Sequence, residues 1–328
     1  MKLKILFCDR GYSESRRQLG PLLPGCELAV CDSNEVRSHV GGADVVVPYG
    51  ARIDTPVIRA GSFGLVQQFG VGLETVDIEA ASAAGVWVAR VPSAQTGNAE
   101  SVAEHAIFLM LALARSATRI ADAQRRGLLG EPSGVTLGGK SACIIGLGGV
   151  GAALGLRLQA MGMRLTGVRV RMILGNPRGV AMRVFPPERL HEAVANADYV
   201  IVCATLDERS YHMIDRAALL AMKPGAIVIN VARGGLVDTT ALVEGLAAGR
   251  IAGAGLDVVE DEPINHSHAL MQHNVVTTPH IAGVTDTSYA GIAAAVADNV
   301  LRFARGEAPQ FAVNDPPSPR WRPKMAAR

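Results

Sequence analysis

Three segments in the last third of the chain carry polar side chains directly after a short apolar run. They contain Arg233, Glu262 and His280, within residues 230–238, 255–263 and 278–283. An arginine can bind a carboxylate through two parallel hydrogen bonds, and a histidine beside a carboxylate can exchange a proton near neutral pH. The three residues therefore form a set suited to acid–base chemistry on a small 2-keto acid.

These side chains converge only if each segment follows a strand of one parallel sheet. Short apolar runs alternate with helical patterns along most of the chain, which is typical of parallel α/β folds. Strands are expected at residues 142–145, 165–168, 199–203, 226–231, 253–256 and 275–277. This series predicts a doubly wound sheet of six strands, whose carboxyl ends form the ligand site.

An earlier series of strands predicts a second parallel sheet. These strands are expected at residues 3–8, 45–47, 65–69 and 87–89, followed by a long helix over Ser101–Arg115. A last helix, Ser288–Arg305, is expected to return to the first sheet. We therefore predict two doubly wound domains: a Rossmann cofactor domain, residues 101–283, inserted in a discontinuous flavodoxin-like substrate domain, residues 1–100 plus 284–328. The tail from Asn314 is expected to be solvated and poorly ordered.

Composition excludes several functional classes. The net charge is only +2, from 32 basic and 30 acidic residues, which argues against a nucleic-acid or membrane surface. Five scattered cysteines predict reduced thiols rather than a disulfide framework. No apolar stretch is long enough to span a membrane, and we expect a cytoplasmic protein. Three histidines crowd residues 266–273 without supporting ligands at a recognisable spacing, so no metal site is expected.

A glycine pattern follows the strand expected at residues 142–145. Gly146, Gly148 and Gly151 form GxGxxG, and a helical stretch comes next. The first glycine permits a tight turn, the second lets a pyrophosphate approach the backbone, and the third lets helix and strand pack closely. The phosphates then meet the free N–H groups of the helix start. This context predicts a bound dinucleotide.

The residue that follows the next strand bears on which dinucleotide binds. An acidic residue about 20 positions after the glycines normally holds the ribose 2′-hydroxyl. Here Arg169 takes that place, with Arg171 close by. A guanidinium complements a 2′-phosphate, which favours NADP over NAD, although NAD stays possible. Alternatively, both arginines are ordinary surface charges.

Several motifs in register resemble the D-isomer-specific 2-hydroxyacid dehydrogenase family, from about Phe69 to Gly283. They are the stretch 70–72, the helix start 102–105, the glycine pattern and the three polar segments. The resemblance implies that His280 is the general acid–base and that Glu262 orients its ring and stabilises the imidazolium. It also implies that Arg233 binds the substrate carboxylate and polarises the carbonyl.

The resemblance implies further contacts. The backbone N–H groups of Val71 and Gly72 would hold the substrate carboxylate, and Tyr49 would line the pocket. Asp257 would accept a hydrogen bond from the nicotinamide carboxamide. Other positions expected at the cofactor or at a hinge for domain closure are Val102, Val150, Thr205, Val231, Ala232 and Gly283. Thr205 stands where the family usually has a proline.

We therefore expect a reductase of small 2-keto acids such as glyoxylate or hydroxypyruvate, assembled as a homodimer through the cofactor domain. One alternative is an NAD-dependent D-3-phosphoglycerate-type dehydrogenase. Pro48 and Gly50 replace the arginines that such relatives carry, but Arg52 lies nearby. A non-catalytic nicotinamide-sensing protein of the same fold is another alternative. Oxidation of formate or phosphite is a third, although the extra polar residues of those relatives are not found beside Gly72.

Overall fold

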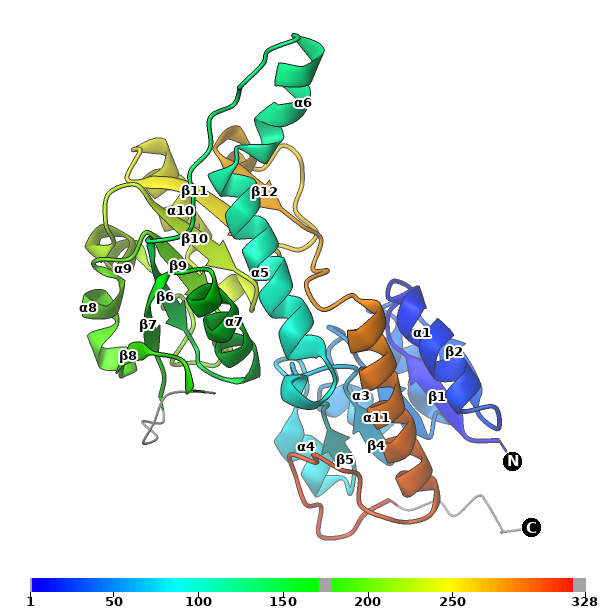
Figure 1. The fold of residues 1–328 in the computed structure, drawn as a ribbon. Helices are drawn as coiled ribbons and strands as arrows, with labels where there is room; N and C mark the ends of the chain where they lie inside the picture. Colours follow the sequence, from blue (N-terminus) through cyan, green and yellow to red (C-terminus); the bar gives the residue numbers. More distant parts are fainter. Residues whose placement is uncertain (1, 171–178, 321–328) are drawn as a thin grey trace. The chain divides into compact units, whose positions relative to one another are not determined.

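The chain divides into two compact units in a computed structural model that describes residues 2–170 and 179–320. One unit contains Met1–Asn98 and Thr285–Arg328, and the other contains Ala99–Val284. Each unit is built on its own parallel sheet (Figure 1). The predicted fold class, a Rossmann-type unit inserted in a discontinuous flavodoxin-like unit, is confirmed.

The first unit has a five-stranded sheet in the order β2-β1-β3-β4-β5. Its strands are β1 (Lys4–Phe7), β2 (Glu27–Val30), β3 (Val45–Val47), β4 (Leu65–Gln67) and β5 (Trp87–Ala89). Helices α1 (Ser13–Leu19) and α11 (Asp286–Ala304) cover one face, and α2 (Val36–His39), α3 (Thr55–Ala60) and α4 (Ile78–Ala83) cover the other. Because both faces are covered, the central strands are apolar at nearly every position.

The sequence analysis missed β2 and was wrong about part of the tail. All four residues of β2 are partly or fully exposed at an edge of the sheet, so no buried apolar run marks it. The side chain of Asn314 accepts a hydrogen bond from Val88 N at 2.8 Å and donates to Val86 O at 2.9 Å. Asn314 and Arg320, whose N–H group donates to Gly85 O at 2.7 Å, are therefore bound beside β5, whereas Asp315, Pro317 and Ser318 are exposed. Residues 321–328 lie outside the described part.

The second unit has a seven-stranded sheet in the order β12-β11-β10-β9-β6-β7-β8. Its strands are β6 (Ser141–Ile145), β7 (Arg164–Val168), β8 (Met182–Phe185), β9 (Tyr199–Val202), β10 (Ala226–Asn230), β11 (Ile251–Leu256) and β12 (Val275–Thr277). The prediction of six strands is wrong because β8 was missed. This edge strand is buried only at Phe185, and Arg183 interrupts its apolar pattern.

Helices cover both faces of the second sheet. The helices α5 (Asn98–Ala114) and α7 (Gly149–Ala160) pack on one face, and α8 (Leu190–Val194), α9 (Arg216–Ala221) and α10 (Thr239–Ala247) pack on the other. Helix α6 (Ala117–Arg125) continues from α5 as an arm (Figure 1). The remaining short 3-10 helices are η1 (Gly20–Leu22), η2 (Val40–Gly42), η3 (Ser93–Gln95), η5 (Pro187–Arg189), η6 (Gly234–Leu236) and η7 (Ala269–Gln272). Within the described ranges, no helix is long and apolar enough to cross a membrane.

The strand order places a ligand-binding crevice at β6. This strand lies beside β9, and the connections that leave β6 and β9 run to opposite sides, towards β7 and β10. In open α/β sheets, ligands bind beyond the carboxyl ends of the strands at such a reversal. The loops that follow β6, β10, β11 and β12 all leave from this edge.

Candidate active site

The glycine loop connects β6 to α7. A Cβ atom at Gly146, where φ is +94°, would lie 2.6 Å from Ala204 N, and one at Gly151 would lie 2.0 Å from Gly146 O. These two glycines are therefore required for packing within the unit. A Cβ at Gly148 would meet nothing within 4 Å. This open space lies at the start of α7, where the first N–H groups have no partner within the helix, and it fits a pyrophosphate.

The other predicted cofactor residues lie around this loop. Val150 is in the first turn of α7, and Thr205 is exposed after β9. Arg169 follows β7 directly and is half-buried, and the neighbouring Val168 O accepts a hydrogen bond from Gly146 N at 2.9 Å. Arg169 therefore begins beside the glycine loop, whereas Arg171 lies outside the described residues.

His280 and Glu262 form a hydrogen-bonded pair. His280 Nδ1 lies 2.9 Å from Glu262 Oε2, and Glu262 Oε1 accepts a hydrogen bond from Val259 N at 3.2 Å. Because a carboxylate only accepts hydrogen bonds, Nδ1 carries the proton of a neutral ring and Nε2 is left for another partner. Both side chains are 38% exposed, so this second nitrogen is open to a small molecule.

The backbone at His280 is held in a left-handed conformation, with φ of 54°. Its N–H group donates to the backbone oxygen of Asp257 at 2.9 Å. The Asp257 carboxylate is buried and accepts hydrogen bonds from Ile281 N at 2.8 Å and from Ala282 N at 3.0 Å. This one aspartate therefore binds the loop on both sides of the histidine.

Two further side chains extend this network. Thr278 Oγ1 lies 2.6 Å from Asp257 Oδ1, and His105 Nε2 on α5 lies 2.8 Å from Thr278 Oγ1. Burial lowers the pKa of His105, although Asp257 opposes the shift. Burial therefore favours the neutral ring of His105. The sequence analysis assigned packing and capping, rather than chemistry, to His105 and gave Thr278 no role.

Arg233 lies in the loop after β10, directly after Val231 and Ala232. Its Nη1 atom donates to Ala232 O at 2.7 Å. The buried side chain of Asn230 donates to Arg233 O at 2.8 Å and accepts from Ala232 N at 3.0 Å. A Cβ at Gly234 would lie 2.0 Å from the carbonyl carbon of Val259, so this loop packs closely against the segment that leads to Glu262.

The side-chain amide of Gln68 binds both loops that carry the predicted substrate residues of the first unit. Gln68 Nε2 donates to Tyr49 O at 2.8 Å and also to Gly72 O, which fixes the loops after β3 and β4 against each other. Val71 lies in the second of these loops. Tyr49 is 8% exposed, its hydroxyl bonds Ser15, and burial raises its pKa. Its ring, rather than an ionisable hydroxyl, is what Tyr49 offers to a ligand.

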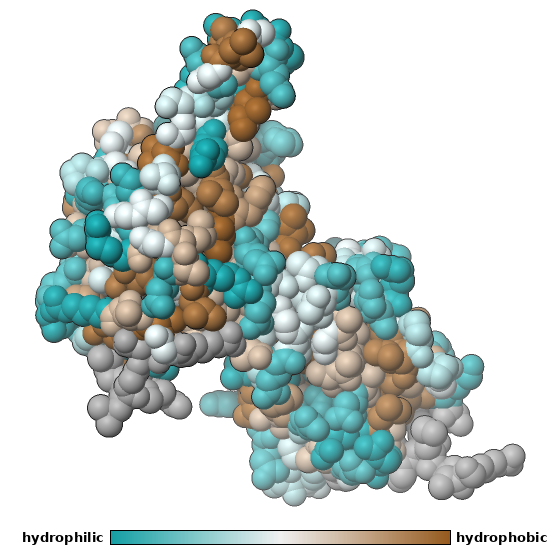
Figure 2. Space-filling view, viewed as in Figure 1, coloured by the Kyte–Doolittle hydropathy of each residue, from teal (hydrophilic) through white to brown (hydrophobic). Residues whose placement is uncertain are grey.

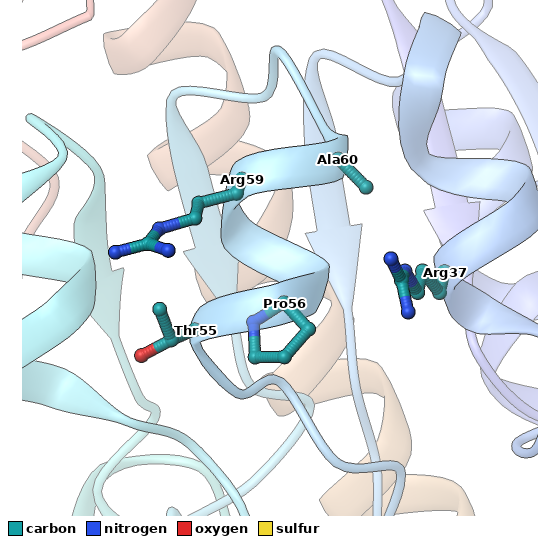
Figure 3. Close-up of a pocket in the computed structure, with 5 residues that line it drawn as sticks. All are labelled: Arg37, Thr55, Pro56, Arg59 and Ala60. Carbon is teal, nitrogen blue, oxygen red and sulfur yellow. The ribbon is translucent and has the colours of Figure 1, made fainter.

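A cavity beside α3 and the cysteines carry no comparable chemistry. The cavity, of about 420 Å³, is lined by Arg37, Thr55, Pro56, Arg59 and Ala60. In Figure 3, the two guanidinium groups lie on different sides of α3 rather than converging on one ligand. No group of three His, Cys, Asp or Glu residues suitable for a metal occurs among the described residues. All five cysteines are free, and burial raises the pKa of Cys143 to about 11.

Residues 107–282 match a protein family described as D-isomer specific 2-hydroxyacid dehydrogenase, NAD binding domain. The chain belongs to this dehydrogenase family. The dehydrogenase is 36% identical over 280 residues to a glyoxylate reductase from Thermococcus onnurineus, with 80% of each chain covered. It is 34% identical over 291 residues to a D-3-phosphoglycerate dehydrogenase from Methanocaldococcus jannaschii, covering 87% of this chain and 54% of that relative.

Solved structures agree with this membership. The dehydrogenase superposes with a TM-score of 0.82 on an NADPH-dependent glyoxylate/hydroxypyruvate reductase from Sinorhizobium meliloti in complex with NADP and malonate. The two chains are 28% identical, and the superposition covers 97% of this chain and 99% of the other. The resemblance found in the sequence is thus confirmed, and the chain is an NAD(P)-dependent 2-hydroxyacid dehydrogenase.

The sequence analysis of this dehydrogenase missed the buried polar residues behind the site. Asn230 holds the Arg233 loop, Gln68 holds the two loops of the first unit, and Thr278 joins His105 to the His280 loop. One signal was available for Asn230, because it ends an otherwise apolar strand three residues before an arginine. Nothing in the local sequence marks the contact between His105 and Thr278.

Proposed function

We propose that this dehydrogenase reduces a small 2-keto acid of the glyoxylate or hydroxypyruvate type to the D-2-hydroxy acid, with NADPH as the reductant. The observation that carries the proposal is the His280–Glu262 pair, which leaves from the same sheet edge as the Arg233 loop and the open glycine loop. An anion-binding arginine and a proton donor at one edge are the two groups that carbonyl reduction of a keto acid requires.

The residues of the second unit perform the steps around the carbonyl. The dinucleotide, held at the glycine loop and α7, supplies the hydride for the carbonyl carbon when it is bound. Arg233 binds the substrate carboxylate and polarises the carbonyl. His280 donates the proton from Nε2 to the carbonyl oxygen, while Glu262 stabilises the positive charge that the ring carries before transfer. The product hydroxyl oxygen keeps this proton, and solvent reprotonates His280.

The first unit would supply the rest of the substrate site. We assign the carboxylate contact to the N–H groups of Val71 and Gly72 and a pocket wall to the ring of Tyr49. Gln68 supports this assignment because it fixes the Tyr49 and Gly72 loops to each other. The unit that contains Ala99–Val284 then serves as the cofactor domain, and the discontinuous unit serves as the substrate domain.

The loss of His280 tests the acid–base role directly. Replacing it with alanine should lower kcat by about a hundredfold or more, the usual contribution of general acid–base catalysis. The affinity for NADPH, measured by fluorescence titration, should change little because the glycine loop is untouched. A His280→Ala variant with wild-type turnover would rule out the proton transfer assigned to this residue.

Arg169 supports the preference for NADPH. It follows β7 beside the glycine loop, and the sequence contains no acidic residue between Ser141 and Pro187 that would accept a bond from a ribose 2′-hydroxyl. We expect Arg169→Asp to shift the ratio of kcat/KM from NADPH towards NADH. The matched control is Arg164→Asp, which makes the same charge change at the opposite, amino end of β7. Equal shifts in both variants would mean that Arg169 does not contact the 2′-phosphate.

The substrate class is tested by a panel of 2-keto acids. Loss of absorbance by reduced nicotinamide should be fastest with NADPH and either glyoxylate or hydroxypyruvate. Oxidation of D-3-phosphoglycerate with NAD, in place of keto-acid reduction, would identify the alternative activity named by the M. jannaschii relative. Tight NADPH binding without turnover of any compound would indicate a nicotinamide-sensing protein.

We also propose a homodimer formed through the cofactor domain. The α6 arm and the loop after it expose Ile120, Leu129 and Val135 at 41%, 97% and 50%. Figure 2 shows hydrophobic side chains at the tip of this arm. A second copy that covers them would remove this apolar surface from water. Leu129→Glu should convert the protein from dimer to monomer in light scattering; a wild-type monomer would exclude the proposal.

A further inference from the structure

His105 stands behind the acid–base histidine without touching it. It lies on α5 and is 14% exposed, and its Nε2 atom lies 2.8 Å from Thr278 Oγ1 and 3.4 Å from Asp257 Oδ1. The direction of each hydrogen bond follows from the chemistry. The Asp257 carboxylate can only accept, so the Thr278 hydroxyl proton is used on Asp257. The oxygen of Thr278 must then accept from His105, which places the proton of the neutral ring on Nε2.

The hydrogen bonds from His105 through Thr278 to Asp257 lead to the loop of His280, whose backbone is strained. His280 has a φ of 54°, a left-handed conformation that is uncommon for a residue with a side chain. Such a conformation persists only where the surrounding structure holds it. The holding contacts here are the N–H groups of Ile281 and Ala282 on the Asp257 carboxylate. The orientation of that carboxylate is set on its other side by Thr278 and His105.

We propose that His105 is a positioning residue for the acid–base histidine, acting through Thr278 and Asp257 to hold the loop that carries His280. This inference rests on the proposed role of His280. The His105 ring reaches no reacting atom itself, and its contribution is the single N–H group that fixes the Thr278 hydroxyl. A small displacement of a proton donor is enough to slow catalysis by one to two orders of magnitude.

Two substitutions at His105 separate a lost hydrogen bond from lost packing. His105→Phe keeps a ring of similar size and removes the donor, whereas His105→Gln keeps an N–H group that can reach Thr278. We expect the phenylalanine variant to lower kcat by about ten- to a hundredfold with little change in the KM for NADPH. The glutamine variant should recover most of the loss. Equal kcat for the phenylalanine variant and wild type, or no recovery with glutamine, would overturn the proposal.

Thr278→Val is a nearly isosteric change that removes the hydroxyl group between His105 and Asp257, so it tests the same series of hydrogen bonds. If the two residues act in one chain, the double variant His105→Phe/Thr278→Val should be no slower than the worse single variant. If the losses in kcat of the two single variants multiply in the double variant, the two residues act independently and the proposal is contradicted. The valine variant also keeps the test usable if the phenylalanine substitution in α5 prevents folding.

Hydrogen exchange gives a readout that needs no turnover. Peptides that cover residues 278–284 should exchange faster in His105→Phe and Thr278→Val than in wild type, while peptides from β6 remain unchanged. If wild type reduces no keto acid but the variants show faster exchange at residues 278–284, the proposed function is wrong, whereas the role of His105 in holding the His280 loop is supported. Unchanged exchange in both variants would refute the positioning role even in an active enzyme.

Discussion

Gly148→Ala and Gly151→Ala each add one methyl group at the glycine loop and the start of α7. The first should weaken cofactor binding, and the second should lower the stability of the fold. At Gly151 the new Cβ would lie 2.0 Å from Gly146 O, whereas real Cβ contacts are essentially never shorter than 3.0 Å. The loop and α7 must therefore move apart by about 1 Å, and overpacking of this kind costs about 1–3 kcal/mol or more. We expect Gly151→Ala to unfold at a clearly lower temperature, with or without a ligand.

Gly148→Ala should leave the fold intact and weaken the cofactor. Its φ and ψ of −75° and −156° are open to alanine, and the new methyl group would meet no protein atom within 4 Å. Loss of a favourable N-cap residue is partly offset by a less flexible unfolded chain, so the free energy of unfolding should change by less than about 1 kcal/mol. The methyl group would, however, occupy the space assigned to the pyrophosphate.

Thermal unfolding of the ligand-free protein and fluorescence titration with NADPH distinguish the two effects. We expect Gly148→Ala to raise the Kd for NADPH at least tenfold, equivalent to about 1.4 kcal/mol. Its unfolding temperature should stay close to that of wild type. Wild-type affinity in Gly148→Ala would refute the reasoning, because the open space at the start of α7 would then hold no part of the dinucleotide.

Three further substitutions test the anchors of the site and of the sheet. Asn230→Ala should lower kcat/KM by about tenfold or more and destabilise the fold by about 1–3 kcal/mol, as judged by steady-state kinetics and urea unfolding, because it removes both bonds that hold the arginine loop. Glu262→Gln should lower kcat most at alkaline pH in a pH–rate profile, because the protonated histidine loses its partner charge. Burial opposes ionisation of Asp198, but hydrogen bonds from Lys223 and Ser141 outweigh it and lower the pKa of this carboxyl to about 2. Asp198→Asn should therefore cost about 1–2 kcal/mol in urea unfolding at neutral pH, and the difference should disappear as the pH falls from about 4 through 2.

The sequence predicted the strands of the two described sheets except the edge strands β2 and β8. Strands buried on both faces, such as β6 and β9, are continuous apolar runs and are recognisable without context. The edge strands β2 and β8 have a neighbour on one side only, and most of their residues are partly exposed. Their patterns therefore resemble those of surface loops, and both were missed.

The candidate site also contains residues that the sequence indicated and residues that it did not. Reactive residues such as His280 and Arg233 were proposed because they follow apolar strands, at whose carboxyl ends ligands bind, and because they lie in motifs that resemble the family. The residues that hold them were not identifiable, because their partners lie far away along the chain. His105 and Thr278 are 173 positions apart, and only the packing of α5 against β12 and its neighbours brings them together.

The buried polar residues also explain how the site keeps its geometry on loops. A loop after a parallel strand has no neighbouring strand to pair with, so its N–H and C=O groups need partners of another kind. Asn230 and Asp257 supply these partners from the end of β10 and from the position after β11, where the sheet itself is rigid. Because each side chain binds the backbone of its own loop, Asn230 and Asp257 position Arg233 and His280 through main-chain atoms. Substitution of either anchor by an apolar residue of similar size should therefore weaken both catalysis and folding, because the N–H groups that it binds lose their acceptor.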